Sequence, residues 1–256
     1  MNLKWFGTAT ILMSEEDTSI LFDPFISMNE ETGAYAHEDA AGVKNIFITH
    51  GHFDHLVDVP QLVRGAGKTV HCCPTAAETL QREEVSPEQI NSLAPGDRIE
   101  IGPFNIRVLK GEHINFDLKL IATTLFNRRL IRNRENAQTI ARLNRNFPQG
   151  QVLVFEIEAK GKKILHMGSL NLDEEETYPE GVDVLTIPFQ GRSDLNEYSL
   201  QFMEKLQPKA LYLHHFDDTF PPISRSVDLE EFRKIMEKRF PHIKVIVPAY
   251  RESISI

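Results

Sequence analysis

The sequence predicts an α+β fold in which two β-sheets pack against each other and helices cover their outer faces. Short apolar segments with strand-like composition come in groups in the first half of the chain, and later alternate with helical segments. The 256 residues are 41% hydrophobic, which is enough for one sizeable core. No low-complexity segment or flexible linker interrupts the pattern, so we expect one domain over residues 1–256.

The first half of the chain carries most of the predicted strands. Apolar runs bounded by glycine, proline or polar turns indicate strands at 3–6, 10–13, 19–22, 45–48, 69–72, 98–101 and 105–110. Helical spacing of apolar residues predicts a helix over 56–63. A second helix is expected over 74–83, with Thr75 as its N-cap and Glu78 completing a capping box, followed by a short helical turn at 86–88.

The second half alternates between the two kinds of element after a basic interruption. Residues 116–149 break the strand rhythm and predict one or two helices, which we interpret as an insertion over about 116–150. Strands are then expected at 151–158, 163–167, 184–187, 210–214 and 243–247, and helices at 196–206 and 227–239.

Composition narrows the classes of function. The formal net charge of −9 disfavours nonspecific binding to nucleic acid or to an anionic membrane. No run approaches the roughly 20 apolar residues of a membrane span, and no basic start precedes a long apolar stretch as in a signal peptide. The two cysteines, Cys72 and Cys73, are adjacent and do not form a disulfide framework, so we expect a cytoplasmic protein.

A cluster of metal-ligand side chains follows the predicted strand 45–48. His50, His52, Asp54 and His55 fall within six residues, between a buried strand and a helix. Imidazole and carboxylate groups are good ligands for zinc, iron or manganese, and their burial together is costly without a metal or a hydrogen-bond network. The alternative, surface histidines in a polar loop, does not explain four such residues after an apolar strand.

These residues carry a resemblance to a known family. THGHFDH, residues 49–55, matches the THxHxDH motif of the metallo-β-lactamase superfamily, and LAPGDRIEIGPFNIRVLKGEH resembles the segment that leads to its third-motif histidine. LYLHHFDDTFPP resembles the late motif of the branch that includes L-ascorbate-6-phosphate lactonase and related metal-dependent hydrolases. The resemblance implies a four-layer αββα sandwich, in agreement with the layers expected from the element pattern.

The resemblance also implies roles for single residues. His50, His52 and His113 would hold one divalent metal ion, and Asp54, His55 and His215 a second. Zinc or manganese is expected, with iron as an alternative, and the metal would activate water as the nucleophile. Asp54 would also act in catalysis by orienting this water or moving its proton. Asp23 would lie behind the ligands and fix the orientation of one of them.

One position departs from the family pattern. Ser169 stands where the family has an aspartate that bridges two metals. A serine hydroxyl is a weak neutral ligand, so we expect a less strongly held second metal, which leaves the number of metal ions open at one or two. Asn171 or Asp173 could compensate. Of the adjacent His214 and His215, we favour His215 as the ligand because strand alternation sends only one of them into the site.

The insertion is basic in an acidic protein. Residues 117–145 carry a charge of +5, which leaves −14 for the rest of the chain. Because arginine is suited to phosphate and carboxylate, we expect Arg128 and Arg132 to attract a small anionic substrate, with Arg192 as a further contact. A solvated helical face, or a contact with a neighbouring subunit in a homo-oligomer, is the alternative.

Three functions follow from these observations. The leading prediction is a metal-dependent hydrolase that uses metal-activated water on a small, anionic ester, lactone or phosphodiester. Nucleic acid is not an expected partner. The alternatives are a mononuclear iron oxidoreductase and a non-catalytic metal- or ligand-binding protein with a degraded second metal site, both of which the serine at position 169 keeps open.

Overall fold

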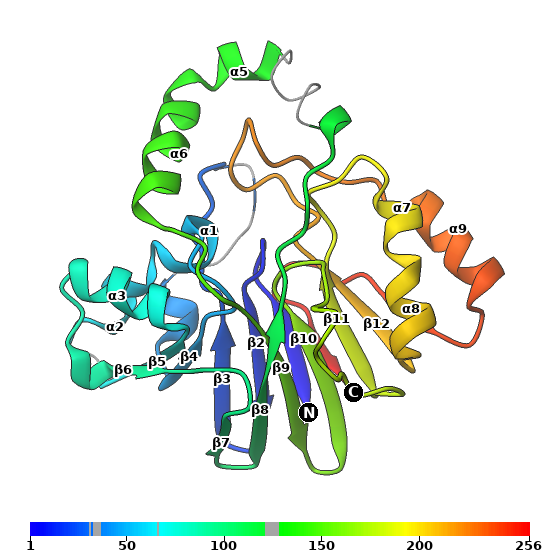
Figure 1. The fold of residues 1–256 in the computed structure, drawn as a ribbon, viewed down its shortest axis with the longest axis horizontal. Coiled ribbons are helices and arrows are strands. Elements are labelled where there is room, and N and C mark those ends of the chain that lie inside the picture. The colour runs from blue at the N-terminus through cyan, green and yellow to red at the C-terminus, as the bar shows by residue number, and fades with distance from the viewer. Residues whose placement is uncertain (31, 33–36, 66, 121–127) are drawn as a thin grey trace.

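The computed structural model describes residues 1–30, 32, 37–65, 67–120 and 128–256. Within this part of the chain, two seven-stranded sheets pack face to face (Figure 1). The first has the order β14 (Ser253–Ser255), β1 (Asn2–Trp5), β2 (Ile11–Glu15), β3 (Thr18–Phe22), β4 (Asn45–Phe47), β5 (Thr69–Cys72), β6 (Ile90–Ser92). The second has the order β13 (Lys244–Ile246), β12 (Ala210–His214), β11 (Val184–Pro188), β10 (Lys162–Met167), β9 (Val152–Ala159), β8 (Phe104–Gly111), β7 (Arg98–Ile101).

Both sheets are built on the same plan. Apart from β14, which pairs antiparallel with β1, antiparallel strands come first along the chain and parallel strands follow. In the first sheet, β3, β4, β5 and β6 are parallel. In the second sheet, β10, β11, β12 and β13 are parallel. Parallel strands end at the same edge of a sheet, where ligands commonly bind. The loops after β3, β4, β10, β11 and β12 therefore become candidates for a shared site.

Helices cover the outer faces, as the sequence predicts. The α-helices of the described residues are α1 (Phe53–Leu56), α2 (Val59–Val63), α3 (Pro74–Arg82), α5 (Arg128–Arg132), α6 (Arg134–Asn146), α7 (Leu195–Tyr198), α8 (Leu200–Leu206) and α9 (Glu230–Arg239). In the described ranges, short 3₁₀ helices cover His37–Ala40 and Pro87–Gln89. Helices α2 and α3 lie on one side of the paired sheets, α8 and α9 on the other, and α5 and α6 stand above the loop edge (Figure 1). The αββα layer order is confirmed.

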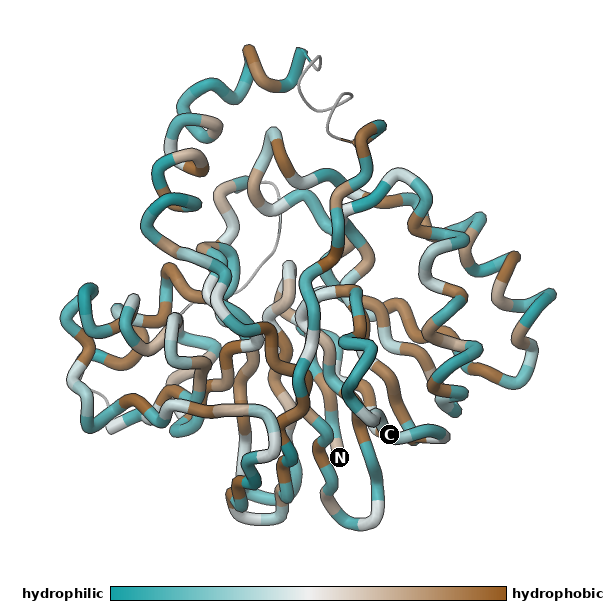
Figure 2. The backbone as a smooth tube through the Cα atoms, in the orientation of Figure 1, coloured by the Kyte–Doolittle hydropathy of each residue, from teal (hydrophilic) through white to brown (hydrophobic). Residues whose placement is uncertain are grey.

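The core lies between the sheets and under the helices. Phe22 and Phe47 of the first sheet contact Phe155 of the second, with ring centroids 5.5 and 5.4 Å apart. A second apolar cluster joins the second sheet to its helices through Leu185, Phe202 and other buried residues. Apolar residues follow the strands, while the helices show polar outer faces (Figure 2). Cys72 and Cys73 are buried and free, as expected. Among the described helices, none has the length and apolarity that a membrane crossing requires.

Some predicted elements need correction. Helix α3 begins after Cys73, with no side-chain cap, so the predicted capping box of Thr75 and Glu78 is wrong; Pro74 needs no cap for its missing N–H. The helix expected over 56–63 is two short helices, and that over 196–206 is also divided in two. A strand that the sequence did not predict, β14, pairs with β1 at the edge of the first sheet. Neither β14 nor β6 was predicted, because each is three residues long with a single apolar residue, whereas the equally short β4 and β13 each have two.

The histidine of β5 links stability to pH. His71 stacks on Phe47 at 4.4 Å, accepts a hydrogen bond from Asn91 Nδ2 (2.9 Å) and donates one to Asn45 Oδ1 (3.0 Å). Burial lowers the pKa of His71 to about 4, whereas an unfolded histidine titrates near 6.5. Between these values the unfolded chain binds the extra proton, so acid destabilises the fold, by up to about 3 kcal/mol for this group.

We therefore expect the free energy of unfolding to fall as the pH drops from 6.5 towards 4. In the variant His71→Gln this fall should be smaller, because glutamine cannot take up the proton. Urea unfolding of both proteins at pH 7, 6, 5 and 4.5 measures the difference. An equal fall in the two proteins would show that His71 is not responsible.

Candidate metal centre

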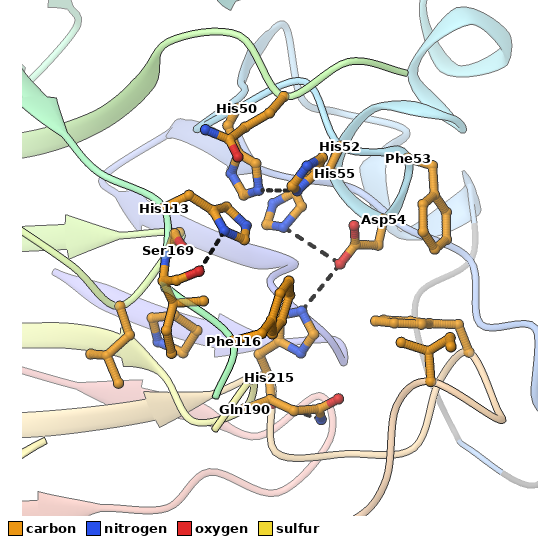
Figure 3. Close-up of a pocket in the computed structure, with 18 of the residues that line it drawn as sticks. His50, His52, Phe53, Asp54, His55, His113, Phe116, Ser169, Gln190 and His215 are labelled. Atoms are coloured by element: carbon orange, nitrogen blue, oxygen red, sulfur yellow. Dashed lines mark hydrogen bonds and ion pairs between the residues drawn. The ribbon is translucent and has the colours of Figure 1, made fainter. Parts of the chain in front are cut away.

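The predicted ligands come from three strand ends. His50, His52, Asp54 and His55 follow β4, and the last two lie within α1. His113 lies two residues beyond β8, and His215 follows β12 directly. All six line one cavity of about 430 Å³ at the loop edge of the sheets (Figure 3). The structure thus brings together residues that are more than 160 positions apart in the sequence.

The first group consists of three histidines. His50 Nε2 lies 3.1 Å from His52 Nδ1, and the His113 ring centroid lies 4.6 Å from that of His52. One nitrogen from each ring can be chosen so that all three lie within 4.8 Å of one another. Burial lowers the pKa of His50 well below its usual value, that of His52 to about 4, and that of His113. At neutral pH the rings are therefore neutral, which is the form that binds a metal, so the donor set fits a divalent ion.

The second group combines a carboxylate with two histidines. Asp54 Oδ2 lies 3.2 Å from His215 Nε2 and 3.6 Å from His55 Nε2. Burial raises the pKa of Asp54, but the neighbouring His55 and His215 lower it to below its usual value, so this carboxylate stays ionised. Their ligand atoms also lie within 4.8 Å of one another. A carboxylate oxygen facing two imidazoles at this spacing is a second donor set that fits a divalent ion.

Asp23 supports the cluster from behind. It lies directly after β3 in a left-handed conformation (φ 44°) and is completely buried. Its carboxylate accepts hydrogen bonds from the Thr49 amide and hydroxyl, both at 2.8 Å, and lies 3.0 Å from His55 Nδ1. Asp23 therefore ties the start of the histidine loop to one ligand ring. Thr49, which sequence reasoning did not single out, is the link between them.

Ser169 contacts the loop that carries His113. Its hydroxyl oxygen accepts a hydrogen bond from the Ile114 amide at 3.0 Å, and it lines the cavity. The preceding Gly168 is required by space, because a Cβ there would lie 2.0 Å from Thr49 Oγ1. Asp173 forms an ion pair with Lys110 Nζ at 2.6 Å and does not line the cavity. Among the described residues, Asp173 therefore does not take the place of the bridging aspartate that Ser169 replaces.

The structure separates the two adjacent histidines at the end of β12. His214 is buried, and its Nε2 donates to the carbonyl oxygen of Met167 (3.0 Å). His215 takes a left-handed conformation (φ 57°), and its amide donates to the carbonyl oxygen of Thr8 (2.7 Å). This turn directs the His215 ring to the cavity. Asp217 accepts hydrogen bonds from the Thr8 amide and from the Tyr250 hydroxyl.

The insertion forms part of the cavity wall with apolar side chains and with the polar side chains of Asn144 and Gln149. Phe116, Leu120, Ile140 and Phe147 line the cavity. An ion pair between Arg129 and Asp218 ties α5 to the loop after β12. Residues 121–127, which belong to the predicted insertion, lie outside the described part of the chain.

The arginines predicted to bind substrate lie in other positions. Arg128 and Arg132 are exposed on α5, and neither is among the described residues that line the cavity. Arg192 does line it, but its guanidinium pairs with Asp194 at 2.6 and 2.8 Å and donates to the carbonyl oxygen of Asn115 at 2.8 Å. Arg192 therefore joins two loops at the cavity edge.

Gln190 is a residue of the site whose function the sequence did not reveal. Its Nε2 lies 3.2 Å from the carbonyl oxygen of His215, and 3.1 Å from those of Asp217 and Arg225. It therefore holds the loop that carries His215. The sequence does not reveal this role, because these contacts join segments that are distant along the chain.

The chain is similar to several known proteins. It is 26% identical over 240 residues to a UPF0173 metal-dependent hydrolase of Staphylococcus aureus (strain JH9), covering 91% of this chain and 92% of that protein. It is 27% identical over 117 residues to a protein of the same description from Xanthobacter autotrophicus, covering 44% of this chain. A Methylocella silvestris relative is 27% identical over 172 residues, 67% of this chain. The match spans about half (48%) of the Xanthobacter protein and 64% of the Methylocella protein.

Solved structures share the fold. The metallo hydrolase Igni18 from Ignicoccus hospitalis superposes with a TM-score of 0.66 at 19% identity, covering 99% of this chain and 97% of that one. An isothiocyanate hydrolase from Delia radicum gut bacteria gives a TM-score of 0.66 at 14% identity, covering 100% and 99%. The family described as "Beta-lactamase superfamily domain" matches residues 18–216, which include all six predicted ligands. The chain therefore belongs to the family described as "Beta-lactamase superfamily domain".

Proposed function

We propose that this protein is a metal-dependent hydrolase acting on an ester, lactone or phosphodiester. The observation that carries the proposal is that two three-residue ligand groups face one cavity. The first group is His50, His52 and His113, and the second is Asp54, His55 and His215. The names of the relatives support hydrolysis, and the 211–222 motif supports lactones among the substrates to be tested.

The residues of the site suit water activation. A divalent ion held by these groups, zinc or manganese foremost, would lower the pKa of bound water to about 7 and polarise the group under attack. Asp54 is ionised and lines the cavity, so it can accept the proton of the attacking water and return it to the leaving oxygen. Water adds to the carbonyl carbon or phosphorus, the bond to the leaving oxygen breaks, and an acid and an alcohol result.

Ser169 bears on the number of ions. Its hydroxyl oxygen is already an acceptor for the Ile114 amide, and it carries no negative charge to join two cations. We therefore infer that the histidine group, His50, His52 and His113, binds its ion more tightly than the group of Asp54, His55 and His215. A single ion is also what the mononuclear iron oxidoreductase alternative requires, so metal identity and reaction must be measured together.

A substrate panel tests the proposal. Purified protein is stripped with a chelator, reloaded with zinc, manganese or ferrous iron, and assayed on esters, lactones and phosphodiesters. We expect hydrolysis that chelation removes and one of the metals restores. Metal binding without hydrolysis of any substrate would contradict the proposal. Oxygen consumption by the iron form would then favour the oxidoreductase, and its absence would favour a binding protein.

A further inference from the structure

The wall of the cavity away from the ligand groups is mainly apolar, with Asn144, Gln149 and Gln190 as its neutral polar members. Its side chains come from well-separated segments and include Phe53, Ile114, Phe116, Ile140, Phe220 and Ile223. Phe53 and Phe220 pack edge to face with ring centroids 5.5 Å apart, beside Asp54 and His215 (Figure 3). This places a rigid aromatic surface next to the second ligand group. A cavity of about 430 Å³ is large enough for a small organic molecule.

Few charged side chains line the cavity outside the two ligand groups. Apart from the ligand groups, Arg192 and Arg225 are the charged side chains among the described residues that line it. Arg192 is occupied by Asp194 and by the carbonyl oxygen of Asn115. Arg225 is exposed and lies at the edge shared with a neighbouring pocket. A highly charged substrate body would therefore lose water along the wall without gaining partners there.

Two large apolar side chains at the cavity remain open to solvent. Phe116 is 55% exposed and Ile223 is 45% exposed. Covering such surface stabilises a complex by about 25 cal/mol per Å². Phe116 also lies edge to face with His113 (5.8 Å), so a group that covers it lies close to the first ligand group.

We propose that the substrate carries an apolar acyl chain, which lies along this wall while its carboxyl end faces the ligand groups. The chemical class is an acyl ester or alkyl-substituted lactone whose non-reacting part is hydrocarbon. This inference rests on the proposed function for the reacting end. The hydrocarbon end is argued from the wall residues themselves.

Binding of straight-chain carboxylates tests the inference without any turnover. The dissociation constants of acetate, butanoate, hexanoate and octanoate are measured by calorimetry with metal-loaded protein. From butanoate to octanoate we expect the affinity to rise about threefold to fourfold per added methylene. Affinity that does not change with chain length would overturn the inference.

A matched pair of variants locates the chain. Ile223→Ser should weaken octanoate binding about fivefold and leave acetate binding unchanged. Ile131→Ser is the control, because Ile131 is 81% exposed on α5 and does not line the cavity; it should change neither. Phe116→Ser, with Leu118→Ser as its control, repeats the test if Ile223→Ser does not fold. Equal loss of acetate and octanoate binding would overturn the placement on this wall.

The two proposals fail separately. Hydrolysis of acetyl esters without any chain-length dependence of binding would overturn the apolar-chain inference and leave the hydrolase proposal intact. Chain-length-dependent binding, without hydrolysis of the corresponding esters by any metal form, would overturn the hydrolase proposal and support the hydrocarbon site.

Discussion

Replacing His52 with alanine is expected to lower kcat/KM for hydrolysis more than about a hundredfold and to weaken metal binding at the histidine group. His52 supplies one of three nitrogens that lie within 4.8 Å of one another. Loss of groups that merely support a ligand costs 10–100-fold, so loss of a ligand should cost more. His52 is only partly buried and lies before α1, so its removal should leave the fold intact.

The measurement combines steady-state kinetics with metal analysis of the same samples. His242→Ala is the control, because His242 is exposed and is not among the residues that line the cavity. It should match the unmodified protein in both readouts. An H52A protein that retains full activity and metal content would show that the histidine group is not the site.

Replacing Asp23 with alanine should produce the largest loss of stability. The buried carboxylate accepts hydrogen bonds from the Thr49 amide and hydroxyl and lies 3.0 Å from His55 Nδ1. Burial lowers the pKa of His55, but the neighbouring Asp23 and Asp54 carboxylates raise it above its usual value. The contact between Asp23 and His55 therefore also has a charged component. Removing the carboxylate leaves the buried Thr49 amide without this acceptor and His55 Nδ1 without its nearest carboxylate, which should lower the free energy of unfolding by about 3 kcal/mol.

Urea unfolding of the metal-free protein measures this effect apart from metal binding. Asp17→Ala is the matched control, since Asp17 is exposed in the turn between β2 and β3 and should change stability by less than about 0.5 kcal/mol. Asp23→Asn keeps the volume but not the charge, and should fall between the two. Equal stability of D23A and D17A would contradict the supporting role of Asp23.

The sequence could predict the ligand cluster because its signal is local. Four ligand-type residues directly after an apolar strand need no knowledge of the rest of the fold. The prediction of His113 and His215 depended on the family resemblance. They lie far from the cluster along the sequence, and only the strand order of the folded sheets brings them to it. The choice of His215 over His214 was made by motif and alternation, and the left-handed turn at His215 is its structural cause.

Other features depend on which way a helix faces, and composition does not tell this. The insertion was predicted to offer its arginines to substrate, yet α6 turns Ile140 to the cavity while Arg142 and Arg145 are exposed. A net charge of +5 describes the segment and not its faces. The apolar wall was also not predicted, because its members are scattered over several loops. Metal identity, cytoplasmic location and oligomeric state stay predictions.

Anomalous X-ray diffraction from crystals of metal-loaded protein tests the central claim most directly. We predict a strong anomalous peak within bonding distance, about 2.0–2.2 Å, of nitrogens of His50, His52 and His113. A weaker peak is expected between Asp54, His55 and His215, because Ser169 supplies no bridging charge. A crystal of protein that binds metal in solution but shows no peak at either group would contradict the assignment of this cavity as the metal centre.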